Sequence, residues 1–185
     1  SMAMETKSQS CIAAWILNDI SDAKTYHQSE EAGFYHFGTG VETFSDKLLK
    51  SQSINKQAIS EADQHMVIQG LLDHGFSPSV NIILFVPEQT LDELFYCMKI
   101  ATEYMLKGTQ IAMTPLLRPQ EGSGIYELIR KGLTPTKAKY VEWKDPDTKE
   151  IFKYPLYCIP HDKQLSDFLE TFNIKEYGDM VRISQ

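Results

Sequence analysis

The stretch from Phe37 to Glu127 alternates between segments typical of strands and segments typical of helices, three of each. A turn rich in polar residues, Pro or Gly follows each predicted strand, at Glu42–Ser45, Pro87–Thr90 and Thr114–Gly124. In a parallel α/β sheet, ligands bind outside the carboxyl ends of the strands. The three turns therefore predict one binding site at one edge of a parallel sheet.

Three segments carry the strand prediction. Phe34–Val41 is rich in aromatic residues and glycine, and Gly38 and Gly40 indicate that another group approaches the backbone closely. Val80–Val86 is an almost continuous apolar run, which is typical of a strand buried on both faces. Gln110–Thr114 completes the set, and we expect the three strands to be parallel neighbours.

Helices are predicted from apolar residues that recur near a spacing of 3.6 and from capping residues. The predicted ranges are Ser21–Ala32, Ser45–Lys50, Asn55–His74, Leu91–Leu106 and Ile125–Lys131. Ser45 is the expected N-cap of the second helix, and Thr90 with Glu93 is an expected capping box. Cys11–Ile20 is apolar, but its periodicity does not distinguish a short helix from a strand.

The pattern changes after residue 132. Ala138–Lys144 alternates between polar and apolar residues, Asp145–Thr148 suits a turn, and Glu150–Ile159 is again typical of a strand, so we expect an antiparallel hairpin. A last helix is predicted over His161–Phe172, with Asp162 as its cap. The expected organisation is a tag or disordered tail over residues 1–10, an α/β domain over 11–132 and an extension over 133–185.

Composition narrows the class of protein. A chain of 185 residues with 42% hydrophobic residues suits one globular domain with a small appendage. The net charge of −7, without a basic stripe, argues against nucleic-acid binding. Three widely spaced cysteines indicate a reducing compartment. No apolar run reaches the ~18 residues of a membrane span, so we expect a cytoplasmic protein without membrane contact.

The sequence contains no motif for a metal site, a serine nucleophile or a phosphate-binding loop. The five histidines have no metal-ligand spacing, and neither a Gly-x-Ser-x-Gly elbow nor a Gly-rich phosphate loop occurs. Cys97 lies on an apolar stripe of a predicted helix, so we expect it to be a small buried hydrophobic residue. We therefore assign neither catalytic residues nor metal ligands.

The strand-end motifs resemble the second half of the radical S-adenosylmethionine barrel. Gly38–Asp46, followed by Leu48-Leu49-Lys50 and Asn55-Lys56, is similar to the fourth-strand segment of that family. Asn81–Thr90 is similar to the fifth strand with its Pro-x-x-Thr exit, and Thr114-Pro115-Leu116 with Gly122–Tyr126 is similar to the sixth. The match spans Gly33–Lys131. It implies an α/β fold: a partial, TIM-like half-barrel of about three parallel strands with crossover helices, plus the C-terminal β-hairpin and helix.

The resemblance also implies contacts to S-adenosylmethionine. They would come from six positions: Glu42, Thr43, Ser45, Asn81, Pro87 and Leu116. The Glu42 carboxylate would accept from the ribose or the methionine end, and the backbone at Pro87 and Leu116 would pass near the adenine. The residues themselves leave other roles open. Thr43 and Ser45 could instead cap a helix, the Asn81 side chain could hydrogen-bond to backbone groups, and Pro87 could simply end the strand.

The sequence departs from the family at its defining feature. It lacks the CxxxCxxC motif that holds a [4Fe–4S] cluster, and no room exists before Gly33 for the first three strands. Phe85 and Glu121 stand where the family often has Gly and Pro. The resemblance therefore implies a fragment of a longer radical enzyme, inactive and without cofactor alone, whose partner is the missing N-terminal half-barrel. The whole enzyme would cleave S-adenosylmethionine reductively to a 5′-deoxyadenosyl radical that abstracts hydrogen from a substrate. Ser1-Met2-Ala3 would then be a cloning remnant before Met4.

A second hypothesis is a non-catalytic interaction module. Strands that are interior in a whole barrel become edges in a half, and edges invite pairing. Such a module would form a homodimer or dock a partner chain through an exposed sheet edge. An unrelated small α/β enzyme would need a catalytic constellation that the motifs do not supply.

Overall fold

The computed structural model describes His27 and residues 29–171, which divide into two compact units. Unit 1 contains the described residues up to Leu84 and the segment Glu93–Pro115. Unit 2 contains Phe85–Asp92 and the described residues from Leu116 onward. The boundary expected after residue 132 stays a prediction. Cys11–Ile20 and most of Ser21–Ala32 lie outside the described residues.

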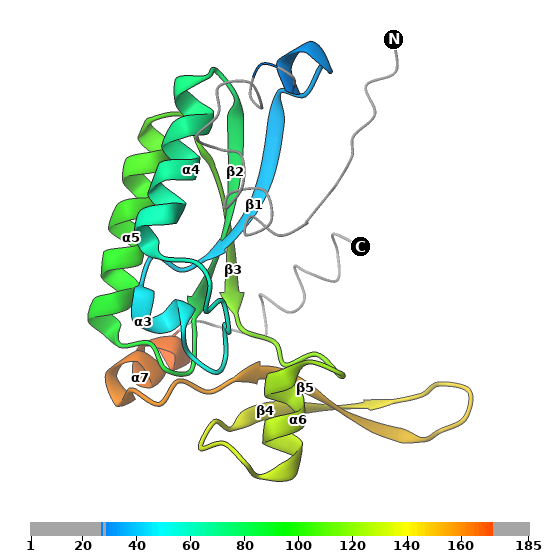
Figure 1. The fold of residues 1–185 in the computed structure, drawn as a ribbon. Helices are drawn as coiled ribbons and strands as arrows, with labels where there is room; N and C mark the ends of the chain where they lie inside the picture. The colour runs from blue at the N-terminus through cyan, green and yellow to red at the C-terminus, as the bar shows by residue number, and fades with distance from the viewer. Residues whose placement is uncertain (1–26, 28, 172–185) are drawn as a thin grey trace. The chain divides into compact units, whose positions relative to one another are not determined.

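A three-stranded parallel sheet forms the centre of unit 1 (Figure 1). Its strands are β1 (His36–Glu42), β2 (Ser77–Phe85) and β3 (Gln110–Leu116), in the order β1-β2-β3. This order confirms that the three predicted strands are parallel neighbours. The sheet does not close into a barrel within the described residues. β2 begins before the predicted Val80 because Ser77 and Pro78 already pair with His36 and Phe37 of β1.

Two long helices, α4 (Glu61–Asp73) and α5 (Leu91–Leu106), lie side by side on one face of this sheet (Figure 1). Their apolar sides and the sheet share one core, which excludes water from both layers. Its buried members are Val41, Phe44, Ile68, Val80, Ile82, Cys97, Ala101 and Tyr104. The short helix α3 (Asp46–Leu49) precedes them, and Ser45 caps it as predicted by accepting from the Leu48 N–H.

α4 begins six residues later than predicted. The turn before it contains Asn55 in the left-handed region, with φ of 54°. Ser60 and Asp63 then form a reciprocal capping box, which satisfies free N–H groups at the helix start. The Ser60 hydrogen bonds hold the pKa of Asp63 below its usual value.

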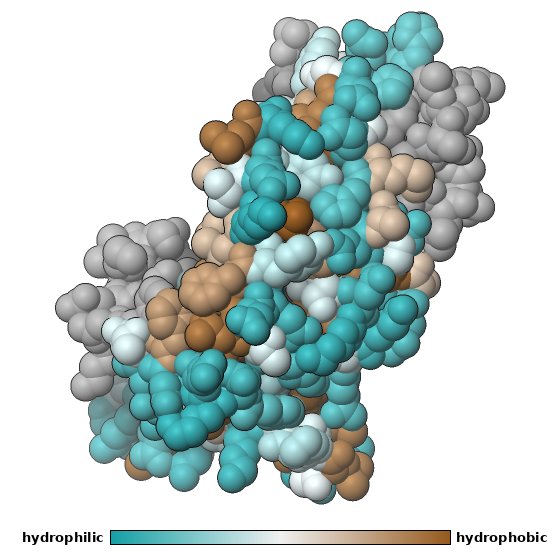
Figure 2. All heavy atoms as spheres, turned by 90° about the vertical axis from the view of Figure 1, so that its left-hand side faces the viewer, coloured by the Kyte–Doolittle hydropathy of each residue, from teal (hydrophilic) through white to brown (hydrophobic). Residues whose placement is uncertain are grey.

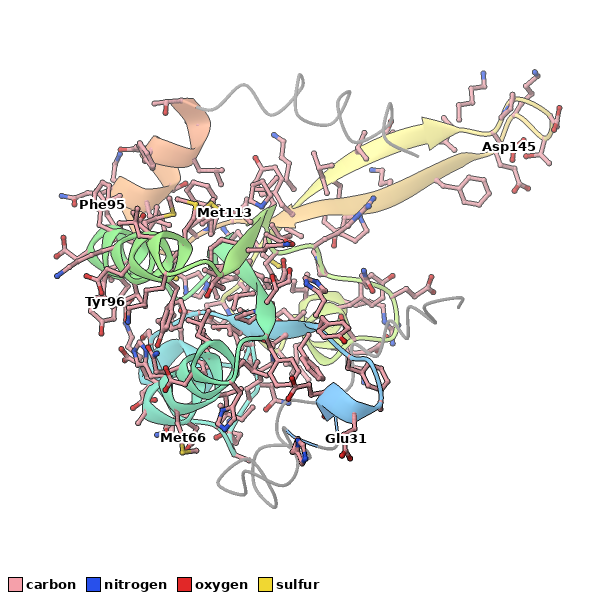
Figure 3. The ribbon with its side chains drawn as sticks, turned by 90° about the horizontal axis from the view of Figure 1, so that it is seen from above. Glu31, Met66, Phe95, Tyr96, Met113 and Asp145 are labelled. Atoms are coloured by element: carbon pink, nitrogen blue, oxygen red, sulfur yellow. The ribbon has the colours of Figure 1, made fainter. Side chains whose placement is uncertain are left out.

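Unit 2 contains an antiparallel hairpin and two short helices. β4 (Ala138–Lys144) pairs with β5 (Ile151–Cys158), and Asp145 lies at the tip of this hairpin (Figure 3). α6 (Gly124–Lys131) ends at Gly132, whose φ of 65° is left-handed, as the sequence predicts. α7 (Lys163–Thr171) begins after Asp162, whose carboxylate accepts from the Leu165 N–H at 2.7 Å and confirms the expected cap.

The outer side of α4 and α5 faces the viewer in Figure 2, where hydrophilic surface predominates and apolar side chains form separate groups. The large exposed hydrophobic residues of these helices are Met66, Phe95, Tyr96, Met105 and Leu106. None of the helices in the described part of the chain has both the length and the apolar character needed to cross a bilayer.

Candidate functional site

Four side chains meet on the sheet of unit 1, and we call Glu42, Lys56, Asn81 and Thr114 the strand-end cluster because Glu42 is the last residue of β1. Asn81 is the middle residue of β2, and Thr114 lies near the end of β3. The Lys56 ammonium lies 3.1 Å from Glu42 Oε1 and also donates to the carbonyl of Gly40. The Asn81 amide donates to Glu42 Oε2 at 3.4 Å, and the Thr114 hydroxyl donates to Asn81 Oδ1 at 3.0 Å. One hydrogen-bonded row therefore joins all three strands.

Strand alternation determines the side of the sheet on which this cluster lies. Val80 and Ile82 are buried in the core under the helices. Because successive side chains of a strand point to opposite faces, Asn81 between them points to the face opposite α4 and α5. Its pairing partner Gly40, and Gly38 two residues earlier, carry no side chain there. A Cβ at Gly38 would meet none of the described residues within 4 Å, so these residues leave room beside the cluster on this face.

Gly40 allows the cluster to lie close against the backbone. A Cβ at this position would lie 2.7 Å from Glu42 Oε1 and 3.3 Å from Lys56 Nζ. The first distance is shorter than real Cβ contacts, so the carboxylate occupies the space that a side chain would take. The expected close approach to the backbone is thus made by the chain's own Glu42 and Lys56.

The backbone of Glu42 is in an uncommon conformation. Gly40 pairs with Asn81 and Glu42 pairs with Ile82, so β1 contains one extra residue, Val41, at a bulge. Glu42 itself has φ of 65°, in the left-handed region that costs a residue with a side chain about 1–2 kcal/mol. Strain of this kind is often found at functional sites.

Lys56 reaches the cluster through the turn before α4. Its backbone N–H donates to the Leu49 carbonyl at 2.7 Å, and the left-handed Asn55 precedes it. The side chain of Lys56 is 28% exposed and that of Glu42 is 20% exposed, so solvent screens their ion pair only in part. Sequence reasoning noted Asn55-Lys56 as part of a pattern but did not assign Lys56 or Thr114 to the site.

The other predicted site residues have different surroundings. Thr43 is fully buried, and its hydroxyl forms no hydrogen bond with the residues that the structure describes. Ser45 caps α3 and donates to Glu93 Oε1 at 3.5 Å. Two of the six predicted site residues, Glu42 and Asn81, are therefore brought together by a hydrogen bond in the strand-end cluster.

Pro87 and Leu116 belong to unit 2. Pro87 is buried, and its carbonyl accepts from the His161 N–H at 2.8 Å. Leu116 is the last residue of β3, and the carbonyl of the next residue, Leu117, accepts from the Cys158 N–H at 2.9 Å. The backbone near both positions therefore already forms hydrogen bonds within unit 2.

A second polar cluster, which sequence reasoning missed, joins α4 to α5. His65 Nδ1 lies 2.6 Å from the Tyr104 hydroxyl, and His65 Nε2 lies 3.4 Å from Glu61 Oε1. The Tyr96 hydroxyl also donates to Glu61 Oε1, which raises the pKa of Tyr96 to about 12 with smaller contributions from burial and nearby acids. In the view from above, Tyr96 and Phe95 project from α5 away from the sheet (Figure 3).

Metal and thiol chemistry receive no support from the described residues. No group of three or more His, Cys, Asp or Glu side chains among them is placed to hold a metal ion. Cys97 and Cys158 are both free and buried. Burial raises the pKa of Cys97, and burial with a smaller contribution from Glu88 raises that of Cys158 to about 12, so both thiols are poor nucleophiles in the folded protein.

The strand-end cluster offers a carboxylate, an ammonium, an amide and a hydroxyl on one sheet face. Groups of these types are the ones that recognise hydroxyl, amino or carboxylate groups through hydrogen bonds, and here they also bond to one another. Comparisons with protein-family models, with curated proteins and with solved structures find no match to this chain.

Proposed function

We propose that this chain is the C-terminal part of a radical S-adenosylmethionine enzyme and supplies cofactor-contacting groups from its parallel sheet. The observation that carries the proposal is the hydrogen-bonded row across three neighbouring parallel strands, from Glu42 at the carboxyl end of β1 through Asn81 in the middle of β2 to Thr114 near the end of β3. In sheets of this kind, the carboxyl end is where ligands bind. The sequence resemblance supports the same location.

The residues present fit S-adenosylmethionine in their chemistry. The Glu42 carboxylate accepts from ribose hydroxyls or from an amino group, and Asn81 both donates and accepts. Gly38 leaves the backbone of β1 without a side chain on this face, next to the space at Gly40 that the Glu42 carboxylate occupies. When bound, the cofactor would supply radical hydrogen abstraction, while this chain binds and orients it.

The iron–sulfur cluster does not fit the described residues. Their two cysteines, Cys97 and Cys158, are buried and belong to different units. We propose that the cluster ligands belong to the N-terminal half-barrel of a longer cytoplasmic parent protein, and that this chain alone is inactive. The half-barrel interpretation of the three-stranded sheet belongs to the same proposal.

The test uses the parent protein, purified without oxygen and supplied with iron, sulfide and reductant. We expect its reading frame to contain CxxxCxxC before this chain and the protein to form 5′-deoxyadenosine from S-adenosylmethionine. Glu42→Gln should weaken cofactor binding by ~10–100-fold, the equivalent of one charge-assisted hydrogen bond. Glu142→Gln is the matched control, because Glu142 forms a similar ion pair with Lys153 at 3.2 Å on the hairpin. A reading frame without the cysteine motif, or equal effects of the two variants, would overturn the proposal.

The alternative is an interaction module that forms a homodimer through β1. Within the described residues, β1 and β3 are the outer strands of the sheet. β3 contains Pro115, but β1 (HFGTGVE) contains neither of the residues, Lys and Pro, that commonly protect an edge. Sedimentation equilibrium of this chain decides the matter: a dimer supports the module, and a monomer across the accessible concentration range contradicts it.

A further inference from the structure

A buried glutamine contacts the bulge that precedes Glu42. Gln64 lies on α4 and is only 2% exposed. Its Nε2 donates to the carbonyl of Val41, the bulged residue of β1, at 2.9 Å. This bond fixes the peptide that leads directly into the left-handed Glu42.

Packing alone does not account for a glutamine at this position. Gln64 Oε1 is buried and forms no hydrogen bond with any part of the chain that the structure describes. Leaving a buried polar atom unsatisfied is unfavourable, whereas Met would fill similar space without that atom. The side chain therefore contributes its one hydrogen bond at a cost in stability.

The next residue of α4 holds the chain on the other side of Glu42. Thr43 and Phe44 are fully buried. The Phe44 ring stacks on the His65 ring, with centroids 5.5 Å apart and planes 14° apart. Gln64 and His65 thus fix the backbone before and after Glu42, and the carboxylate of Glu42 extends from this fixed segment to Lys56 and Asn81.

We propose that Gln64 is a positioning residue for the strand-end cluster. Its hydrogen bond to Val41 sets the left-handed turn at Glu42 and so aims the carboxylate at the Asn81 amide. The inference concerns a contact within this chain and requires no cofactor. Its failure would therefore leave the proposed function standing, and failure of the proposed function would leave this contact unaffected.

The test measures the side-chain amide resonances of Asn81 by ¹⁵N–¹H NMR, because that amide donates to Glu42. Asn81→Asp assigns the resonances, and Glu42→Gln gives the displacement expected when the carboxylate is lost. Gln64→Met removes the hydrogen bond to Val41 at similar side-chain volume. The matched control is Ile68→Val, one turn later on α4, where Ile68 is buried in the same core without contacting that carbonyl through a side-chain hydrogen bond.

We expect Gln64→Met to move the Asn81 resonances toward their Glu42→Gln positions by at least half of that displacement. A change no larger than that of Ile68→Val would show that Gln64 is only a core residue and would overturn the proposal. If Gln64→Met does not fold, Gln64→Asn serves under the same criterion, because it keeps the amide but is too short to reach Val41.

Discussion

At the scale of single residues, Glu42 and Gly40 depend on each other. Glu42 is in a backbone conformation that glycine adopts most readily, and Gly40 provides the space that the Glu42 carboxylate occupies. Lys56 bonds to both, through the Gly40 carbonyl and the Glu42 carboxylate. The geometry of the strand-end cluster thus requires a glycine at position 40 and a charged side chain at position 42.

This dependence predicts different outcomes for two similar substitutions in β1. Gly40→Ala should displace the Glu42 carboxylate and lower the free energy of unfolding by about 1–3 kcal/mol, the range for overpacking. Gly38→Ala is the matched control, because its Cβ would meet no atom of the described part of the chain within 4 Å, and it should be neutral or slightly stabilising. Urea unfolding of the two variants measures the difference. Equal free energies of unfolding for the two variants would contradict the prediction, because they would show that the Glu42 carboxylate can move away from position 40 without loss of stability.

At the scale of elements, the composition of short segments, such as the almost continuous apolar run of Val80–Val86, predicted the strands. Periodicity and caps predicted most helices, because burial on one face of a helix repeats along the chain. The start of α4 was missed because Ser60 and Asp63, not the earlier apolar residues, define it. The ion pair of Lys56 with Glu42 was also missed. Fourteen residues separate the two positions, and the left-handed turn at Asn55 that brings them together leaves no periodic signal.

The cluster between α4 and α5 predicts a pH dependence. The Tyr96 hydroxyl donates to Glu61, and its pKa is raised to about 12, whereas a tyrosine in the unfolded chain ionises near ~10. The folded state therefore holds this proton more tightly, so its contribution to stability is complete below pH ~10 and is lost as pH rises through about 12.

Glu61→Gln removes the largest cause of this shift. Absorbance at 295 nm between pH 8 and 11.5 should then show one more ionised tyrosine than in the unmodified chain, and Tyr96→Phe in the same background should abolish the additional step. Identical titration curves for the unmodified chain and Glu61→Gln would contradict the assignment.

At the scale of the whole molecule, the two units differ in what stabilises them. Unit 1 has a three-stranded sheet covered by two helices. The sheet of unit 2 is a two-stranded hairpin, an element that is marginal in water without further packing. Among the residues that the structure describes, each unit contains one buried thiol, Cys97 in unit 1 and Cys158 in unit 2, so local opening of each unit is measurable separately.

We expect both thiols to react with a disulfide reagent at least ~100-fold more slowly than in the unfolded chain, because burial keeps them protonated and covered. Cys158 should react faster than Cys97, since unit 2 opens more readily. The measurement uses two single-cysteine variants, with Cys11→Ser in both and Cys158→Ala or Cys97→Ala in turn. The same rate for both thiols at every urea concentration would indicate one cooperative unit instead of two.

The division of the chain between the units also bears on its synthesis. The backbone passes from one unit to the other three times, after Leu84, after Asp92 and after Pro115. The described residues of unit 1 end at Pro115, whereas Phe85–Asp92 shares its unit with residues from Leu116 onward, which are translated later. We therefore expect unit 1 to fold while the chain is still growing, and unit 2 to form only after the hairpin and α7 have been translated.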